Sequence, residues 1–147
     1  MWLMLVPVIL CAEAVHRDLN DREIPDRISL ILFITGLVST ALSWHTVSFL
    51  DALLGVLVGF VVVLPFTLRD GIGGGDLKLI AALGAWLGVT GTMSLLFWTA
   101  ISGVVAAVVA HTRKQKDFAY APAILAGLVI TLLWPTSLTL LVAWLRG

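Results

Sequence analysis

The chain has 147 residues, of which 60% are hydrophobic and 12% charged, and its mean hydropathy is +1.07. Soluble domains carry about 25% charged residues, so this composition excludes an ordinary soluble domain and indicates a bundle surrounded by lipid. Nine basic residues balance nine acidic ones, which gives no signal for nucleic-acid binding.

Six apolar segments follow one another along the chain. A bilayer span needs about 20 mostly apolar residues, and the candidates are residues 2–15, 28–44, 52–68, 77–89, 93–110 and 122–145. The first and fourth are short, which indicates tilting or cover by neighbouring helices. We therefore expect an all-α, polytopic membrane bundle of about six transmembrane helices, built as a single domain over residues 1–147.

The N-terminal segment resembles a secretion signal, because Ala12-Glu13-Ala14 has the pattern of a cleavage site. However, no basic residue precedes the apolar run and Glu13 interrupts it. We therefore expect the first helix to be retained. The single cysteine, Cys11, lies inside this run, so the sequence predicts no internal disulfide and no zinc site.

Basic residues indicate how the bundle is oriented. They occur in the first, third and fifth loops and at the C-terminal end, but not in the second or fourth loop; the loop residues are Arg17, Arg22, Arg27, Arg69, Lys78, Arg113, Lys114 and Lys116. By the positive-inside rule the odd loops face the cytoplasm, and both termini lie outside it. The basic clusters also suit anionic lipid headgroups.

The first loop, HRDLNDREIPDRISL at residues 16–30, alternates acidic and basic residues. For most of them a solvated turn with mutually screened charges is the simplest explanation. Asp26 follows Pro25 and precedes an apolar run, so we expect it to cap the second helix. Asp18 directly continues the first span, which places it near the membrane surface and able to point back into the bundle.

The third loop contains GIGGGDLKL at residues 71–79. Consecutive glycines permit positive φ and close approach of the backbone to another chain. Asp76 then begins the fourth span, where the helix dipole favours an anion. The alternative is a flexible loop in which Asp76 is only a helix cap. Lys78 does not share a helix face with Asp76. We expect its side chain to anchor the helix at the interface between membrane and water.

Asp18 and Asp76 lie at the ends of two different spans on the same predicted face of the membrane. An ionisable residue at such a depth is by default a functional hypothesis. Two carboxylates brought together share a proton, because like charges a few ångströms apart cannot both ionise cheaply. One carboxylate then activates water while its protonated partner polarises a scissile carbonyl. This chemistry needs no metal and no cofactor.

These residues resemble the type IV prepilin peptidases. GGGD followed by LKL resembles that family's G-x-G-D motif, and DLNDREIP resembles its first aspartate motif. The segment FAYAPAILAG at 118–127 is similar to a late Pro-containing segment of the family. The resemblance implies cleavage of a leader peptide from prepilin or pseudopilin precursors at the cytoplasmic face of the bacterial inner membrane, in pilus biogenesis or protein secretion.

The resemblance also implies residue roles. Asp18 and Asp76 are the expected catalytic pair, and five residues are expected to bind substrate or shape the loops: Gly73, Gly74, Gly75, Pro25 and Lys78. The family has Asn after Ile-Pro, where this chain has Asp26. The chain starts directly in the first span and so is similar to the short peptidases of tight-adherence (Flp) pilus systems, for which we expect no methyltransferase activity.

Two other classes remain as alternatives. A small ion or proton transporter would bind a cation at Asp18 and Asp76, but such sites lie near the midplane between symmetric halves, not at one surface. A non-catalytic membrane subunit of a secretion system would use the glycine loop only to pack helices. The second alternative predicts that Asp76→Asn is tolerated.

Overall fold

The computed structural model describes residues 4–21, 23–44, 47–69, 71–112 and 120–134, and in these ranges the regular structure is helical throughout. The helices are α1 (Leu5–Asp21), α2 (Asp26–Ala41), α3 (Phe49–Thr67), α4 (Gly74–Thr112) and α5 (Ala121–Leu133). The prediction of an all-α fold is confirmed.

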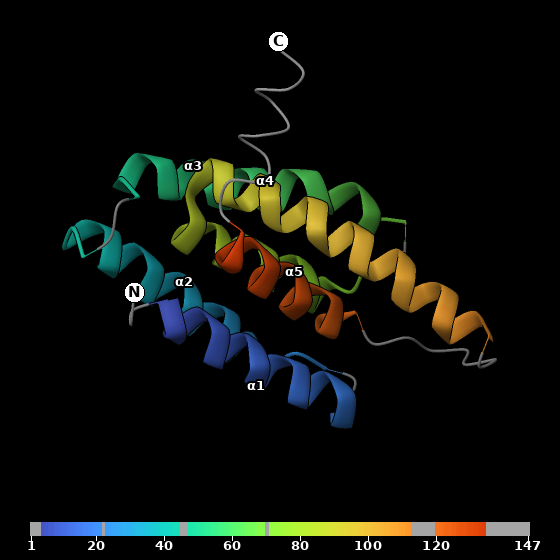
Figure 1. Ribbon diagram of the computed structural model, residues 1–147. Helices are drawn as coiled ribbons and strands as arrows, with labels where there is room; N and C mark the ends of the chain where they lie inside the picture. Colours follow the sequence, from blue (N-terminus) through green and yellow to red (C-terminus); the bar gives the residue numbers. More distant parts are fainter. Residues whose placement is uncertain (1–3, 22, 45–46, 70, 113–119, 135–147) are drawn as a thin grey trace, which may run out of the picture.

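Five helices are assigned to the described residues where six were expected, because the fourth and fifth expected spans are two helical arms that a kink joins into α4. The turn expected at residues 90–92 is helical. The backbone instead leaves helical geometry at Gly88, with φ 64° and ψ −172°, a conformation that glycine adopts most easily. Figure 1 shows the chain reversing there, so that the first arm of α4 (residues 74–87) and the second arm (residues 89–112) run in opposite directions. Residues 135–145 of the expected sixth span lie outside the described residues.

A polar contact from α3 holds the reversal in α4. Ser48 caps α3 by accepting a hydrogen bond from the backbone N–H of Asp51. The Asp51 carboxylate in turn accepts a hydrogen bond of 3.3 Å from the N–H of Val89. This N–H begins the second arm of α4, where amide groups lack partners within their own helix. A Cβ at Gly88 would collide with the same carboxylate.

Small residues let α3 approach the first arm of α4 closely. The buried positions of α3 are Ala52, Gly55, Gly59 and Val63, which form one stripe. A Cβ at Gly84 would collide with the backbone of Gly55. Such close approach through small side chains is typical of helix pairs in membranes, where dispersion contacts drive association.

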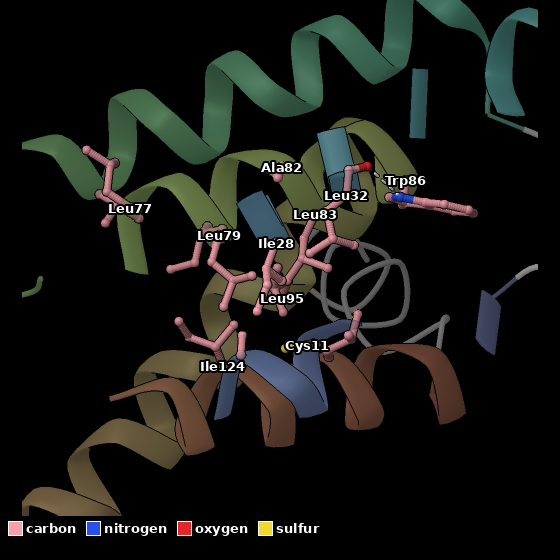
Figure 2. Close-up of a cluster of buried hydrophobic side chains, with 14 residues drawn as sticks. Cys11, Ile28, Leu32, Leu77, Leu79, Ala82, Leu83, Trp86, Leu95 and Ile124 are labelled. Atoms are coloured by element: carbon pink, nitrogen blue, oxygen red, sulfur yellow. Dashed lines mark hydrogen bonds between the residues drawn. The ribbon is translucent and has the colours of Figure 1, made fainter. Parts of the chain in front are cut away.

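The core lies around the first arm of α4, which occupies the middle of the bundle (Figures 1 and 2). Trp86 is 1% exposed, and its indole N–H donates a hydrogen bond of 2.9 Å to the backbone carbonyl of Leu32 on α2. Figure 2 shows side chains from α1, α2, α4 and α5 meeting in this core. Its largest members are Leu32, Leu79, Ile80, Leu83, Trp86, Leu95, Ile124 and Leu128.

Successive helices, and the two arms of α4, run in alternating directions. The end of one helix therefore lies near the start of the next. The end of α1, the start of α2, the end of α3, the start and end of α4 and the start of α5 lie at one end of the bundle (Figure 1). The first and third loops, which carry the acidic and glycine-rich motifs, therefore adjoin each other. We call this end the loop end.

The exterior of the bundle is apolar. Large hydrophobic side chains with more than half of their surface exposed occur on α2, α3 and α4, among them Leu30, Leu57, Val61 and Val104. Two helical stretches, Phe49–Thr67 and Gly74–Val109, are long and apolar enough to cross a membrane by length and composition. An apolar surface of this extent is expected where lipid, rather than water, contacts the protein.

Candidate active site

Asp18 continues a buried stripe on α1. The buried residues of that helix are Pro7, Cys11, Ala14 and Asp18, a spacing of four, three and four residues that keeps them on one helix face. Asp18 is 9% exposed. On the opposite face Glu13 pairs with Arg17 at 3.0 Å, and both side chains are about half exposed. Helical periodicity alone therefore turns Asp18 into the bundle.

The N-terminus of α5 holds Asp18. Its Oδ2 atom accepts a hydrogen bond of 3.3 Å from the backbone N–H of Ala121, the first residue of α5. A helix N-terminus carries partial positive charge, so a carboxylate is favoured there. The sequence flagged this Pro-containing segment only through its resemblance to a family. Its partner, Asp18, lies 103 positions earlier in the chain.

Asp76 lies in the first turn of α4. The carbonyl of Gly73 accepts the first helical hydrogen bond, from Leu77, which makes Gly73 the N-cap residue. The Asp76 carboxylate accepts a hydrogen bond from the Gly73 backbone, in the manner of the third-position acid of a capping box. Asp76 is 7% exposed, and its Oδ1 atom is buried without a hydrogen-bond partner among the described residues. The helix-cap explanation thus accounts for one of the two oxygens.

The structure brings Asp18 and Asp76 into the same region of the loop end. The two carboxyl groups are close enough for the charge of Asp18 to act on Asp76. Each group is bound by the N-terminus of a different helix, α5 and α4 respectively. Two buried like charges are costly together, so the pair favours a state that holds one proton. Such a pair contains both a base and an acid.

Tyr120 adjoins this pair and was missed by the sequence analysis. It is the N-cap residue of α5, and a Cβ at Gly103 on α4 would lie 2.8 Å from its ring. Burial, followed by the negative charge of Asp76, raises the pKa of Tyr120 above its ordinary value of 10.0. The phenol therefore stays neutral near the carboxylates. Gly103 provides the space for the ring.

The glycine loop uses one of the two properties that consecutive glycines permit. Among the described glycines only Gly88 has a positive φ, so Gly73, Gly74 and Gly75 do not adopt the left-handed conformation. Close approach does occur, because a Cβ at Gly75 would lie 3.0 Å from the Cβ of Ile24. A Cβ at Gly74 would meet nothing within 4 Å. Gly75 thus lets the third loop pack against the Ile-Pro segment of the first loop.

Asp26 does not cap α2 with its side chain. Pro25 is the N-cap residue, with φ −60° and ψ 130°, and no side-chain cap hydrogen bond is present. Asp26 is the first helical residue and forms an ion pair of 2.6 Å with Lys78, which lies 52 positions later. Lys78 therefore links the start of α4 to the start of α2. Both side chains are more than half exposed, so this pair adds little stability.

No group of three or more His, Cys, Asp or Glu residues that could hold a metal ion occurs in the part of the chain that the structure describes.

Comparison with known proteins assigns the family. The sequence model of the type IV leader peptidase family matches residues 4–108, which include both Asp18 and Asp76. The chain belongs to the type IV leader peptidase family. Three relatives named prepilin leader peptidase/N-methyltransferase are similar to it: those of Neisseria gonorrhoeae (35% identity over 84% of this chain), Bacillus subtilis strain 168 (33% over 82%) and Aeromonas salmonicida strain A449 (30% over 83%).

The chain spans about half the length of these curated relatives: 46%, 51% and 45% of the three proteins, respectively. No solved structure is significantly similar to the chain.

The contact between Gly75 and Ile24 can be tested by overpacking. Gly75→Val would push a branched side chain into Ile24, and we expect a loss of about 1–3 kcal/mol in the free energy of unfolding, measured in detergent. Gly74→Val is the matched control and should change little, because nothing lies within 4 Å of its Cβ. Ile24→Ala combined with Gly75→Val should recover part of the loss. Equal losses in the two glycine variants would contradict the contact.

Proposed function

We propose that this family member is a membrane aspartyl endopeptidase that cleaves the leader peptide of prepilin-like precursors. The observation that carries the proposal is the pair of buried carboxyl groups, Asp18 from α1 and Asp76 from α4, at one end of the bundle. The relatives' names pair a leader peptidase with an N-methyltransferase. The proposal takes only the peptidase activity from them, because a carboxyl pair supplies the base and the acid of a hydrolysis.

In the proposed reaction, the ionised carboxyl group removes a proton from water as the water oxygen attacks the scissile carbonyl carbon. The protonated carboxyl group donates its hydrogen bond, and then its proton, to the carbonyl oxygen. Collapse of the tetrahedral intermediate breaks the C–N bond: the leaving nitrogen takes up the proton that the first carboxylate removed from water, and a hydroxyl of the intermediate returns a proton to the second carboxylate, so the pair again holds one proton. The N–H groups of Ala121 and the Gly73 backbone hold the two carboxylates in position throughout.

The Oδ1 atom of Asp76, which has no hydrogen-bond partner among the described residues, supports this assignment over a purely structural one. A buried polar oxygen without a hydrogen-bond partner costs stability. Such oxygens are expected where a substrate or a water molecule supplies the missing hydrogen bond. A helix cap would need no second carboxylate nearby. The glycine residues, Pro25 and Lys78 are proposed to shape the loops around the pair rather than to react, as the contact of Gly75 with Ile24 suggests.

The alternatives are less well supported. A transporter site near the middle of the membrane does not match carboxylates held at helix termini of the loop end. A non-catalytic subunit would not need two carboxyl groups buried within electrostatic range of each other.

The loop end is proposed to face the cytoplasm of a bacterial inner membrane, with the helices crossing it several times. The support is the positive charge of the first, third and fifth loops of the sequence, together with the position of the described parts of the first and third loops at one end of the bundle (Figure 1). The precursor would then meet the pair from the cytoplasmic side.

Replacing either carboxylate tests the catalytic proposal. Asp18→Asn and Asp76→Asn should each reduce cleavage of a co-expressed prepilin at least about 10³-fold, and the double variant should be no worse, because the two groups act as a unit. The gel-mobility shift of the precursor measures cleavage, and immunoblotting of membranes measures accumulation. Asp21→Asn is the control, since Asp21 is exposed in the last turn of α1. Substantial cleavage by Asp76→Asn would contradict the mechanism and favour the non-catalytic subunit.

Single cysteines test the topology. In a Cys11→Ala background, cysteines at Asp21 and Gly71 should react only with reagents that reach the cytoplasm, because both residues lie at the loop end. A cysteine at Trp44, at the opposite end and 58% exposed, should react with an impermeant reagent added outside. Labelling of all three from one side would rule out the proposed arrangement.

A further inference from the structure

A groove of about 490 Å³ lies between α2, α3 and the first arm of α4, outside the carboxyl pair. Its apolar lining consists of Leu30 and Phe33 from α2, Phe60 from α3, and Ala81 and Ala82 from α4. The two alanines are buried, whereas Leu30 and Phe60 are 57% and 42% exposed. The groove therefore opens on the lipid-facing surface.

The groove has a positively charged end. Asp26, Arg27 and Lys78 line it there, and Lys78 is neutralised by its ion pair with Asp26. Arg27 is exposed and forms no ion pair within the described ranges. Two cations and one carboxylate leave a net charge of +1. Arg27 also lies in the first turn of α2, whose N-terminus has no side-chain cap, so the amide groups of that turn add to the attraction for an anion.

Ser29, whose hydroxyl is buried, is one of the residues that line the groove next to this charged end. Ser29 is 6% exposed, and its Oγ atom is buried with no hydrogen-bond partner among the described residues. Ser29 lies two residues beyond Arg27 on α2, about 3 Å further along the helix axis and away from the loop end. A buried hydroxyl without a partner costs stability, so the site favours a ligand that accepts a hydrogen bond at that depth.

We propose that this groove binds an anionic glycerophospholipid of the membrane. The phosphate would contact Arg27 and the uncapped start of α2, the ester carbonyl would accept a hydrogen bond from Ser29, and one acyl chain would lie against Phe33 and Phe60. The order of these groups along α2 matches the order of charge, ester and hydrocarbon in a phospholipid.

The size of the groove also favours an acyl chain over a peptide helix. A helix with its side chains is about 10–12 Å across, and one long enough to cross the bilayer is about 30 Å long. Such a cylinder has several times the groove's volume of about 490 Å³. A bound lipid would tie the start of α2 to α4 beside the Lys78–Asp26 pair, close to the contact between the first and third loops.

Native mass spectrometry of the purified full chain in a mild detergent tests the proposal. Phosphatidylglycerol and phosphatidylcholine with the same acyl chains are titrated separately, and bound lipid is counted. The unchanged protein should retain one phosphatidylglycerol at least about tenfold more tightly than phosphatidylcholine. This preference reflects the charge-assisted contact with Arg27.

Two variants separate the contribution of the Arg27 charge to lipid binding from that of the Ser29 hydroxyl. Arg27→Gln should lower phosphatidylglycerol affinity about tenfold and remove the preference between the lipids. Ser29→Ala should weaken both lipids by a similar factor, because both carry the ester carbonyl, and leave the preference intact. Arg69→Gln is the matched control: Arg69 is an exposed cation at the loop end that does not line the groove, and its loss should leave binding unchanged.

Three outcomes would overturn the proposal. Equal losses in Arg27→Gln and Arg69→Gln would mean general attraction of lipid to surface charge. Unchanged binding in both Arg27→Gln and Ser29→Ala would place the lipid elsewhere. Equal retention of the two lipids by the unchanged protein, together with protection of a cysteine at Leu30 by a prepilin peptide, would assign the groove to the precursor instead.

Discussion

Two carboxyl groups of like charge are buried at the same end of an apolar bundle, and this arrangement constrains the rest of the structure. Removing a carboxylate from water is costly unless hydrogen bonds and a favourable potential replace the water. Two helix N-termini provide both: that of α5 contacts Asp18 and that of α4 contacts Asp76. The remaining repulsion favours a single shared proton. The site thus exists only because α4 and α5 both begin where α1 ends.

The reversal inside α4 makes that arrangement possible. Its first arm runs away from the loop end through the core, and Gly88 turns the second arm back toward it. Asp51 binds the N–H of Val89 at this turn, and small residues such as Gly55 and Gly84 allow the tight packing beside it. The second arm then packs along α5, where Gly127 lies against Thr99, and so positions the start of α5 beside Asp18. Polar contacts at the far end therefore contribute to the geometry of the carboxyl pair.

The sequence predicted the helical class and the two aspartates because these depend on patterns of residue type. Apolar segments reveal helices in lipid, and an ionisable residue at a segment end is conspicuous. The sequence predicted a turn between the fourth and fifth spans but placed it at residues 90–92 rather than at Gly88, because its exact position depends on a carboxylate of another helix. The backbone N–H of Ala121 has no signature in residue type. The ion pair between Lys78 and Asp26 joins residues 52 positions apart. It was not predicted, because the sequence explained Lys78 as an anchor at the membrane surface and Asp26 as a helix cap.

The pH dependence of kcat/KM, measured with purified protein and a prepilin substrate, tests most directly whether the pair shares a proton. The account predicts a bell-shaped profile: activity falls at low pH as both carboxyl groups become protonated and no base remains, and at high pH as both ionise and no acid remains. The two apparent pKa values belong to the pair rather than to either residue. Asp21→Asn should leave the profile unchanged. A profile that rises from low pH and then stays flat to high pH would contradict the account, because activity would then require only ionised carboxylates.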